Sequence, residues 1–123
     1  MVDHANKTIQ PFDLKTIGKG VYNFPTSFYQ FAYFRQAAFY TLALEHWVEQ
    51  RKEIVDLAGY KRLPFQFVAV DSKAKSHSPA IIYQCTDKDL NRGLYGGKVR
   101  GGPEVDGIYD LVAAYKWHMS TNE

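Results

Sequence analysis

Runs of apolar residues bounded by polar ones predict strands in the first and middle parts of the chain. Residues 65–70 and 80–85 are mostly apolar, and the polar residues 71–78 between them predict a turn, so we expect an antiparallel hairpin. Residues 3–15 predict a second hairpin, which turns at residues 5–7 and returns along residues 9–14.

Helical spacing marks three other segments. One long helix is predicted from about residue 28 to about residue 51, and a capping box at residues 86–89 predicts a short helix that continues to about residue 94. The glycine-rich residues 93–107 are expected to be irregular, and Pro103 with Glu104 to start the last helix. The apolar positions expected on the buried faces are Phe28, Phe31, Ala32, Phe39 and Leu42 in the long helix and Ile108, Leu111, Val112 and Tyr115 in the last one.

The order of these elements predicts an α/β fold, in which a small mixed sheet is flanked by helices. A length of 123 residues favours one domain over the whole chain, residues 1–123, and 46% hydrophobic with 23% charged residues is typical of a soluble globular protein. The net charge of +2 is too small to indicate nucleic-acid binding, so any such contact must come from local basic clusters.

Cysteine content and hydropathy limit the classes further. The single cysteine, Cys85, rules out a disulfide within one chain, and its apolar surroundings predict an inert core thiol. No apolar run approaches the length of a membrane span, and the first residues lack a signal-peptide pattern, so we expect a cytoplasmic protein with no membrane partner.

Asp13 and Lys15 are the residues that most suggest chemistry. Two positions apart on a strand, they project from one face, and Leu14 between them is expected to point into the core. A carboxylate beside an ammonium suits metal-assisted phosphodiester cleavage, because the carboxylate holds a divalent cation and the lysine orients water or stabilises charge on the phosphate. The alternative is a surface ion pair at the end of a strand.

Gln36 and Tyr40 follow on the long predicted helix, and a separation of four residues places them on one helical face. Together, residues 9–16 (Ile-Gln-Pro-Phe-Asp-Leu-Lys-Thr) and residues 33–40 (Tyr-Phe-Arg-Gln-Ala-Ala-Phe-Tyr) resemble the PD-(D/E)XK nuclease superfamily. The resemblance is closest to the exodeoxyribonuclease VIII (RecE-type) and phage exonuclease branch, in which a D-x-K-T strand precedes a helix with Q-x-x-x-Y. It covers most of this chain but only the later part of the family's domain.

The resemblance implies a restriction-endonuclease-like core and a Mg²⁺- or Mn²⁺-dependent DNA exonuclease of phage or bacterial recombination. It makes the Asp13 carboxylate and the Leu14 carbonyl metal ligands and Lys15 the catalytic lysine, with Gln36 and Tyr40 positioning Lys15 or the DNA phosphate. It also implies two partners, DNA and a recombination (annealing) protein. Candidate DNA contacts are Thr16, Lys19, Tyr33, Arg35, Arg92, Lys98 and Arg100.

The family's first metal-binding aspartate should precede the D-x-K strand, and Asp3 is the only acidic residue there. With a turn at residues 6–7, Asp3 faces Gln10, roughly 10 Å short of the position opposite Asp13. We therefore expect a partial domain, truncated at its N-terminus. Two alternatives remain open: a catalytically incomplete fragment that binds DNA or protein, and a homo-oligomer formed through an exposed sheet edge.

Overall fold

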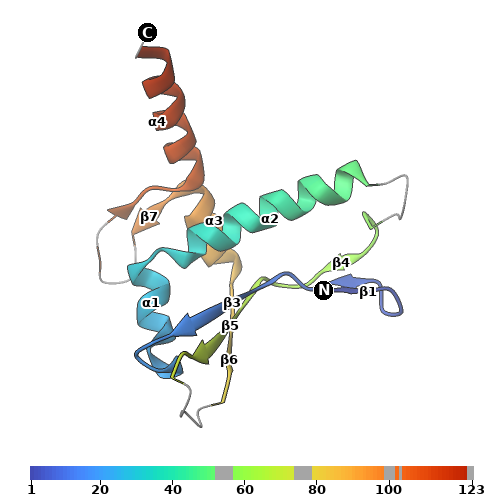
Figure 1. The fold of residues 1–123 in the computed structure, drawn as a ribbon. Helices are drawn as coiled ribbons and strands as arrows, with labels where there is room; N and C mark the ends of the chain where they lie inside the picture. Colours follow the sequence, from blue (N-terminus) through green and yellow to red (C-terminus); the bar gives the residue numbers. More distant parts are fainter. Residues whose placement is uncertain (52–56, 74–78, 99–101, 103, 122–123) are drawn as a thin grey trace.

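The computed structural model describes residues 1–51, 57–73, 79–98, 102 and 104–121, and it has the mixed α/β architecture predicted from the sequence (Figure 1). In the described residues, the strands are β1 Val2–Asp3, β2 Thr8–Ile9, β3 Phe12–Ile17, β4 Lys61–Arg62, β5 Gln66–Asp71, β6 Ile81–Gln84, β7 Gly97–Lys98 and β8 Glu104–Val105. The helices are the short 3-10 helix η1 Val21–Asn23 and the α-helices α1 Phe24–Gln30, α2 Tyr33–Gln50, α3 Asp87–Tyr95 and α4 Ile108–Thr121.

The main sheet consists of β3, β5 and β6, in the spatial order β3-β5-β6. β5 and β6 pair antiparallel, which confirms the predicted hairpin, although residues 74–78 of its turn lie outside the described residues. β3 runs parallel to β5, with Asp13 beside Phe67 and Lys15 beside Ala69. A parallel pair needs a long crossover, and α1 and α2 provide it.

The N-terminal hairpin is real but shorter than predicted, and its register differs. β1 pairs with β2 so that Asp3 lies beside Thr8, not beside Gln10. The reason is a tight turn: the Asp3 carboxylate accepts hydrogen bonds from the backbone N–H groups of Ala5 and Asn6. β3 is therefore not the return strand of this hairpin. β2 pairs in parallel with β4, where no strand was predicted from the sequence.

The long helix predicted from residue 28 to 51 is two helices. Ala32 has φ 51° and ψ 46°, a left-handed conformation that separates α1 from α2. The break changes which residues are buried: Phe28 is fully buried as predicted, whereas Phe31, Phe39 and Leu42 are exposed. The buried residues of α2 near its start are instead Phe34, Ala37 and Ala38.

The core between the main sheet and the helices is built from aromatic rings. Phe24, Phe28, Phe34 and Phe67 are inaccessible to solvent, and Phe28 lies 4.5 Å from the half-buried Tyr83, measured between ring centroids. Burying each of these phenylalanines stabilises the fold by about 1.5–3 kcal/mol relative to an exposed side chain. The α1–α2 pair is thereby held firmly on the β3 and β5 strands.

α3 begins at the predicted capping box. The Thr86 hydroxyl accepts from the Asp89 N–H, and the Asp89 carboxylate accepts from the Thr86 N–H. Gly93, predicted to open an irregular segment, lies inside this helix and packs closely against Phe34 of α2. Further along the same segment, β7 and β8 form a small antiparallel pair.

α4 begins at Ile108, later than predicted, because Glu104 belongs to β8; Pro103 lies outside the described residues. The Asp110 carboxylate accepts a hydrogen bond from the Gly107 N–H at this start. The buried face predicted for α4 is wrong: none of its residues is buried, and the helix extends away from the rest of the molecule (Figure 1). Within the described residues, no helix has both the length and the apolar character needed to span a membrane.

Candidate functional site

Asp13 and Lys15 lie on the side of β3 that faces α1 and α2. The prediction that Leu14 points into the core is wrong, because Leu14 is 59% exposed on the opposite face of the sheet. The helix-covered face is already filled by the aromatic core, and Ile17 joins that core from β3. Since side chains alternate along a strand, the inward Ile17 fixes Lys15 and Asp13 on the same inward side.

Lys15 is held by one carboxylate and two aromatic rings. Its Nζ lies 2.9 Å from Asp13 Oδ2, and the side chains of Lys15 and Asp13 retain only 18% and 27% of their accessible surface. The same Nζ lies 4.6 Å from the centroid of the Tyr33 ring and 5.9 Å from that of Phe67. This is therefore more than the exposed ion pair that the sequence left open, since partial burial strengthens its electrostatic interactions.

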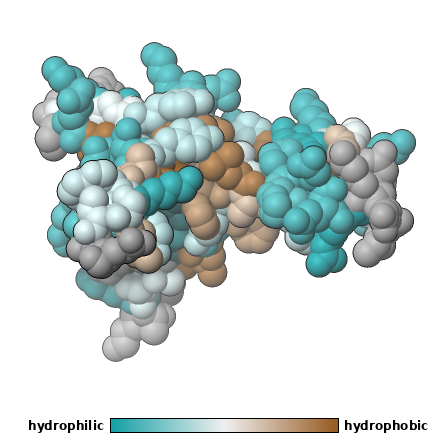
Figure 2. Space-filling model, turned by 90° about the horizontal axis from the view of Figure 1, so that it is seen from above, coloured by the Kyte–Doolittle hydropathy of each residue, from teal (hydrophilic) through white to brown (hydrophobic). Residues whose placement is uncertain are grey.

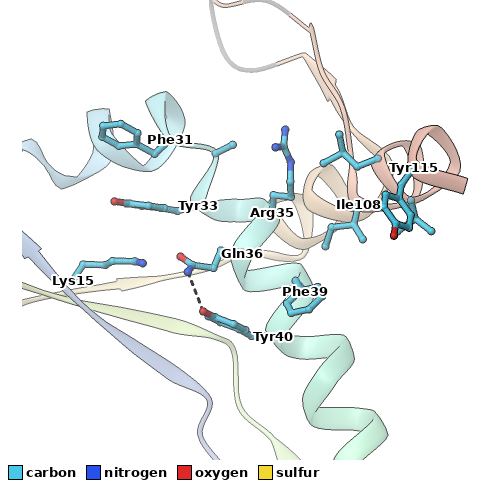
Figure 3. Close-up of a pocket in the computed structure, with 12 residues that line it drawn as sticks. Lys15, Phe31, Tyr33, Arg35, Gln36, Phe39, Tyr40, Ile108 and Tyr115 are labelled. Atoms are coloured by element: carbon cyan, nitrogen blue, oxygen red, sulfur yellow. Dashed lines mark hydrogen bonds between the residues drawn. The ribbon is translucent and has the colours of Figure 1, made fainter. Parts of the chain in front are cut away.

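α2 brings Gln36 and Tyr40 to the same place. Gln36 Nε2 donates a hydrogen bond of 3.1 Å to Tyr40 Oη, one helical turn away, as their spacing predicts (Figure 3). The Tyr40 ring stacks on Phe65, with 6.1 Å between ring centroids. Figure 3 shows Lys15 from β3 and Gln36 from α2 pointing toward one another.

Two buried oxygen atoms at this site lack hydrogen-bond partners. Gln36 Oε1 has none among the described residues, and neither does Asp13 Oδ2, whose short contact with Lys15 does not have the direction of a hydrogen bond. A buried acceptor without a donor costs about 1–3 kcal/mol. Gln36 Oε1 can therefore gain stability by accepting a hydrogen bond or by contacting a cation, whereas Asp13 Oδ2 already contacts the Lys15 ammonium.

The site opens into a cleft of about 670 Å³ between α2 and the start of α4. Its polar wall is made by Lys15, Tyr33, Arg35, Gln36 and Tyr40. Its apolar wall is made by Phe31, Phe39, Ile108, Leu111, Val112 and Tyr115, and Ala32 also lines the cleft. Figure 2 shows hydrophobic surface gathered near the middle of the face seen from above, with hydrophilic surface on both sides.

Arg35 links the two sides of the cleft by a hydrogen bond. Its Nε donates a 3.1 Å hydrogen bond to the backbone carbonyl of Asp106, just before α4, so α2 and the base of α4 are linked across the opening. Sequence reasoning missed the contributions of Phe31, Phe39 and the base of α4, because it assigned them to the core. The aromatic content of 15% was the available indication, because the chain has more aromatic side chains than the buried core contains.

The ligands for a divalent cation are few. Asp13 is the only carboxylate that the described residues bring to the Lys15–Gln36 pair, and they contain no group of three or more His, Cys, Asp or Glu side chains suited to a metal. Asp3 belongs to another sheet, where Asn6 and Ala5 donate to its carboxylate; the Asn6 hydrogen bonds hold the pKa of Asp3 below its usual value. The Asp13 carboxylate and the Gln36 amide oxygen are oxygen donors, the type of ligand that Mg²⁺ takes in proteins.

The remaining candidate DNA contacts are dispersed. Thr16 and Lys19 line an adjoining hollow beside the loop that follows β3, which shares Phe31 and Tyr33 with the cleft, and Arg92 and Lys98 line a third hollow beside α3. Arg100 lies outside the described residues. The structure therefore brings together Asp13, Lys15, Tyr33, Arg35, Gln36 and Tyr40, whereas Thr16, Lys19, Arg92 and Lys98 do not line the cleft.

The chain matches no protein-family model, no curated protein and no solved structure.

Proposed function

We propose that this chain is a divalent-cation-dependent deoxyribonuclease of the PD-(D/E)XK type, an exonuclease of phage or bacterial recombination. The observation that carries the proposal is that Asp13 pairs with Lys15, and Lys15 lines the same cleft as Gln36 and Tyr40. This arrangement combines an oxygen ligand, a fixed cationic donor and two polar side chains in one partly desolvated place. A role in recombination also implies a cytoplasmic location and an annealing protein as a partner.

Asp13, with the Leu14 carbonyl and the Gln36 amide oxygen as further donors, would hold Mg²⁺ or Mn²⁺. When bound, such a cation lowers the pKa of water and neutralises charge on a phosphate. The Lys15 ammonium then donates to the phosphate oxygens or to the attacking water. Asp13 and the Tyr33 ring hold that ammonium in place, so little reorganisation is needed when charge develops.

The Gln36–Tyr40 pair acts as a positioning unit. Since Gln36 Nε2 is occupied by Tyr40 Oη, the Gln36 oxygen has a fixed direction, and the Tyr40 hydroxyl hydrogen remains to donate. A phosphate oxygen or a bound water is a suitable acceptor for it. The exposed rings of Phe31 and Phe39 can stack with the bases of a strand that enters the cleft.

The test is digestion of linear duplex DNA with Mg²⁺ or Mn²⁺ by the parent chain and two variants. Lys15→Ala should lose about a hundredfold or more in rate, since it removes a donor that stabilises developing charge. The matched control is Lys61→Ala, an exposed lysine in the separate β1-β2-β4 sheet, which should cleave as the parent does. Failure of the parent to cleave, or equal cleavage by Lys15→Ala, would refute the proposal.

A second candidate is a catalytically incomplete module that binds DNA or a protein. It is favoured by the single carboxylate that the described residues bring to the site and by the apolar wall of the cleft. It predicts binding of single-stranded DNA without added cation and no cleavage with it. Titration of a fluorescent oligonucleotide in EDTA, with Phe39→Ala as the cleft variant and Lys61→Ala as the control, separates it from the first candidate.

A further inference from the structure

The main sheet has an open edge, formed by β3. One side of β3 pairs with β5, and no strand within residues 1–51, 57–73, 79–98 and 104–121 pairs with its other side. β1 covers that side only as far as Gln10, which exchanges two backbone hydrogen bonds with Met1. In the described part of the chain, the edge from Phe12 onward has no partner strand.

The backbone of β3 alternates between its two sides. The Gln66 N–H donates to the Pro11 carbonyl, so the odd-numbered residues direct their backbone polar groups toward β5: the C=O of Pro11, and the N–H and C=O of residues 13, 15 and 17. Phe12, Leu14 and Thr16 therefore direct theirs toward the open side. An antiparallel strand can bond to this edge only if its own outward residues lie opposite these three.

A second copy of β3 meets this condition. With Leu14 opposite Leu14 of the partner subunit, Phe12 faces the partner's Thr16, and about six backbone hydrogen bonds form. Asp13 then faces the partner's Lys15, and Lys15 faces the partner's Asp13. A shift by two residues would place aspartate opposite aspartate or lysine opposite lysine, which is unfavourable. The shift toward β1 would also require Gln10, which is already bonded to Met1.

On the face of the sheet opposite Asp13 and Lys15, apolar side chains of the two copies meet in the same register. Leu14 lies beside Val68, and Val68 lies beside Ile82, so these side chains form one row across the three strands. Leu14 and Ile82 are 59% and 61% exposed. Pairing through Leu14 joins this row to the same row of the second copy and buries part of Leu14 in each.

We propose that this chain forms a two-fold symmetric dimer by antiparallel pairing of β3, with Leu14 opposite Leu14, which makes one continuous sheet of six strands from the two main sheets. The charge pattern, the outward backbone groups and the apolar row all fit the same register. β3 is an exposed edge only in the single chain.

The dimer would also change the ligands available at the site: the Leu14 carbonyl bonds to the N–H of Leu14 of the partner subunit, and a second carboxylate comes near Asp13 in its place. The partner's Asp13 lies diagonally across from Asp13, about 7–8 Å away between Cα atoms. Two carboxylates at this separation can reach one divalent cation between them, since metal–oxygen distances of about 2.1 Å add to the length of each side chain. This second step rests on the proposed nuclease function, whereas the pairing of β3 does not.

Disulfide cross-linking tests the register. In the proposed dimer, the two Leu14 Cα atoms are about 5.5 Å apart, within the range of a disulfide. Oxidised Leu14→Cys should therefore run as a covalent dimer on a non-reducing gel. The matched control is Phe12→Cys, on the same exposed face, because two copies of residue 12 lie about 13 Å apart and cannot be bridged. The native Cys85 is buried and should not contribute.

Charge exchange tests the same contact without a new bond. Asp13→Lys and Lys15→Asp should each weaken self-association about tenfold or more, since each places like charges opposite one another. An equimolar mixture of the two variants should associate again, because every facing pair is then of opposite charge. Circular dichroism of each variant shows whether it has folded, and the Leu14→Cys experiment remains decisive if one of them has not.

Sedimentation of the parent chain at high micromolar concentration completes the test. A monomer, equal cross-linking of the two cysteine variants, or a variant mixture that stays monomeric would each overturn the proposal. None of these measurements depends on cleavage or on a cation. A monomer that digests DNA would therefore overturn the dimer proposal and support the nuclease proposal. A dimer that digests no DNA would support the dimer proposal and overturn the nuclease proposal.

Discussion

Adding one methyl group at Gly93 tests how closely α2 and α3 must approach. A Cβ atom built at this position lies 2.3 Å from the Phe34 carbonyl oxygen and 2.6 Å from the Ala38 Cβ, whereas ordinary contacts begin near 3.4 Å. The obstructing oxygen belongs to the backbone of α2 and cannot rotate away. Gly93→Ala would therefore force the two helices apart by about 1 Å in a region that is otherwise closely packed.

Two effects of opposite sign determine the magnitude. Alanine favours a helix by about 1 kcal/mol over glycine, and Gly93 is within α3. Overpacking costs about 3 kcal/mol, the upper end of the usual range, because both neighbours are rigid. We expect the free energy of unfolding to fall by about 2 kcal/mol and the melting temperature by about 8 °C.

Urea unfolding followed by circular dichroism measures this difference. The matched control is Gly59→Ala, where a Cβ atom would meet nothing within 4 Å, and its stability should stay within about 0.5 kcal/mol of the parent or rise slightly. A Gly93→Ala chain as stable as the parent would show that α2 and α3 are not packed as closely as described.

Three further measurements test other parts of the fold. Ala32→Gly should raise the free energy of unfolding by about 0.5–1 kcal/mol, because glycine relieves the left-handed strain between α1 and α2; lower stability in urea would contradict this. Thr86→Ala should lower it by about 1 kcal/mol through loss of the α3 cap, and Thr86→Ser should restore most of it. Burial, with the nearby Asp89 charge, raises the pKa of the Cys85 thiol from 9.0 to about 12, so the folded chain keeps a proton that the unfolded chain releases. Stability should therefore fall as pH rises from about 9 to 12, less steeply in Cys85→Ala, and iodoacetamide at pH 9 should label Cys85 only as fast as the chain unfolds.

The sequence was informative where one local rule dominated. The hairpin strands β5 and β6 followed from their apolar runs, and the α3 start followed from Thr86 and Asp89, since a capping box requires only residues close in sequence. The Gln36–Tyr40 contact followed from a spacing of four on a helix. Each of these predictions depended on neighbours within a few positions.

The errors came from tertiary contacts that no local pattern encodes. By alternation, Leu14 should be buried and Lys15 exposed, but the aromatic core already fills the helix-covered face, and the Lys15 stem lies on the Tyr33 ring. The break at Ala32 has no glycine to mark it, so the long helix appeared continuous. The register at Asp3 was set by its own carboxylate hydrogen bonds to the turn.

The parallel pairing of β3 with β5 has a consequence for how the chain is made. β3 leaves the ribosome before α1, α2 and β5, yet its neighbour in the sheet is not synthesised until residue 71. During that interval, the strand that carries Asp13 and Lys15 has no β5 to pair with, and such long-range pairing is slow to form. The strand that carries Asp13 and Lys15 is thus synthesised well before its neighbour and can take its place in the sheet only after α1, α2 and β5 have followed.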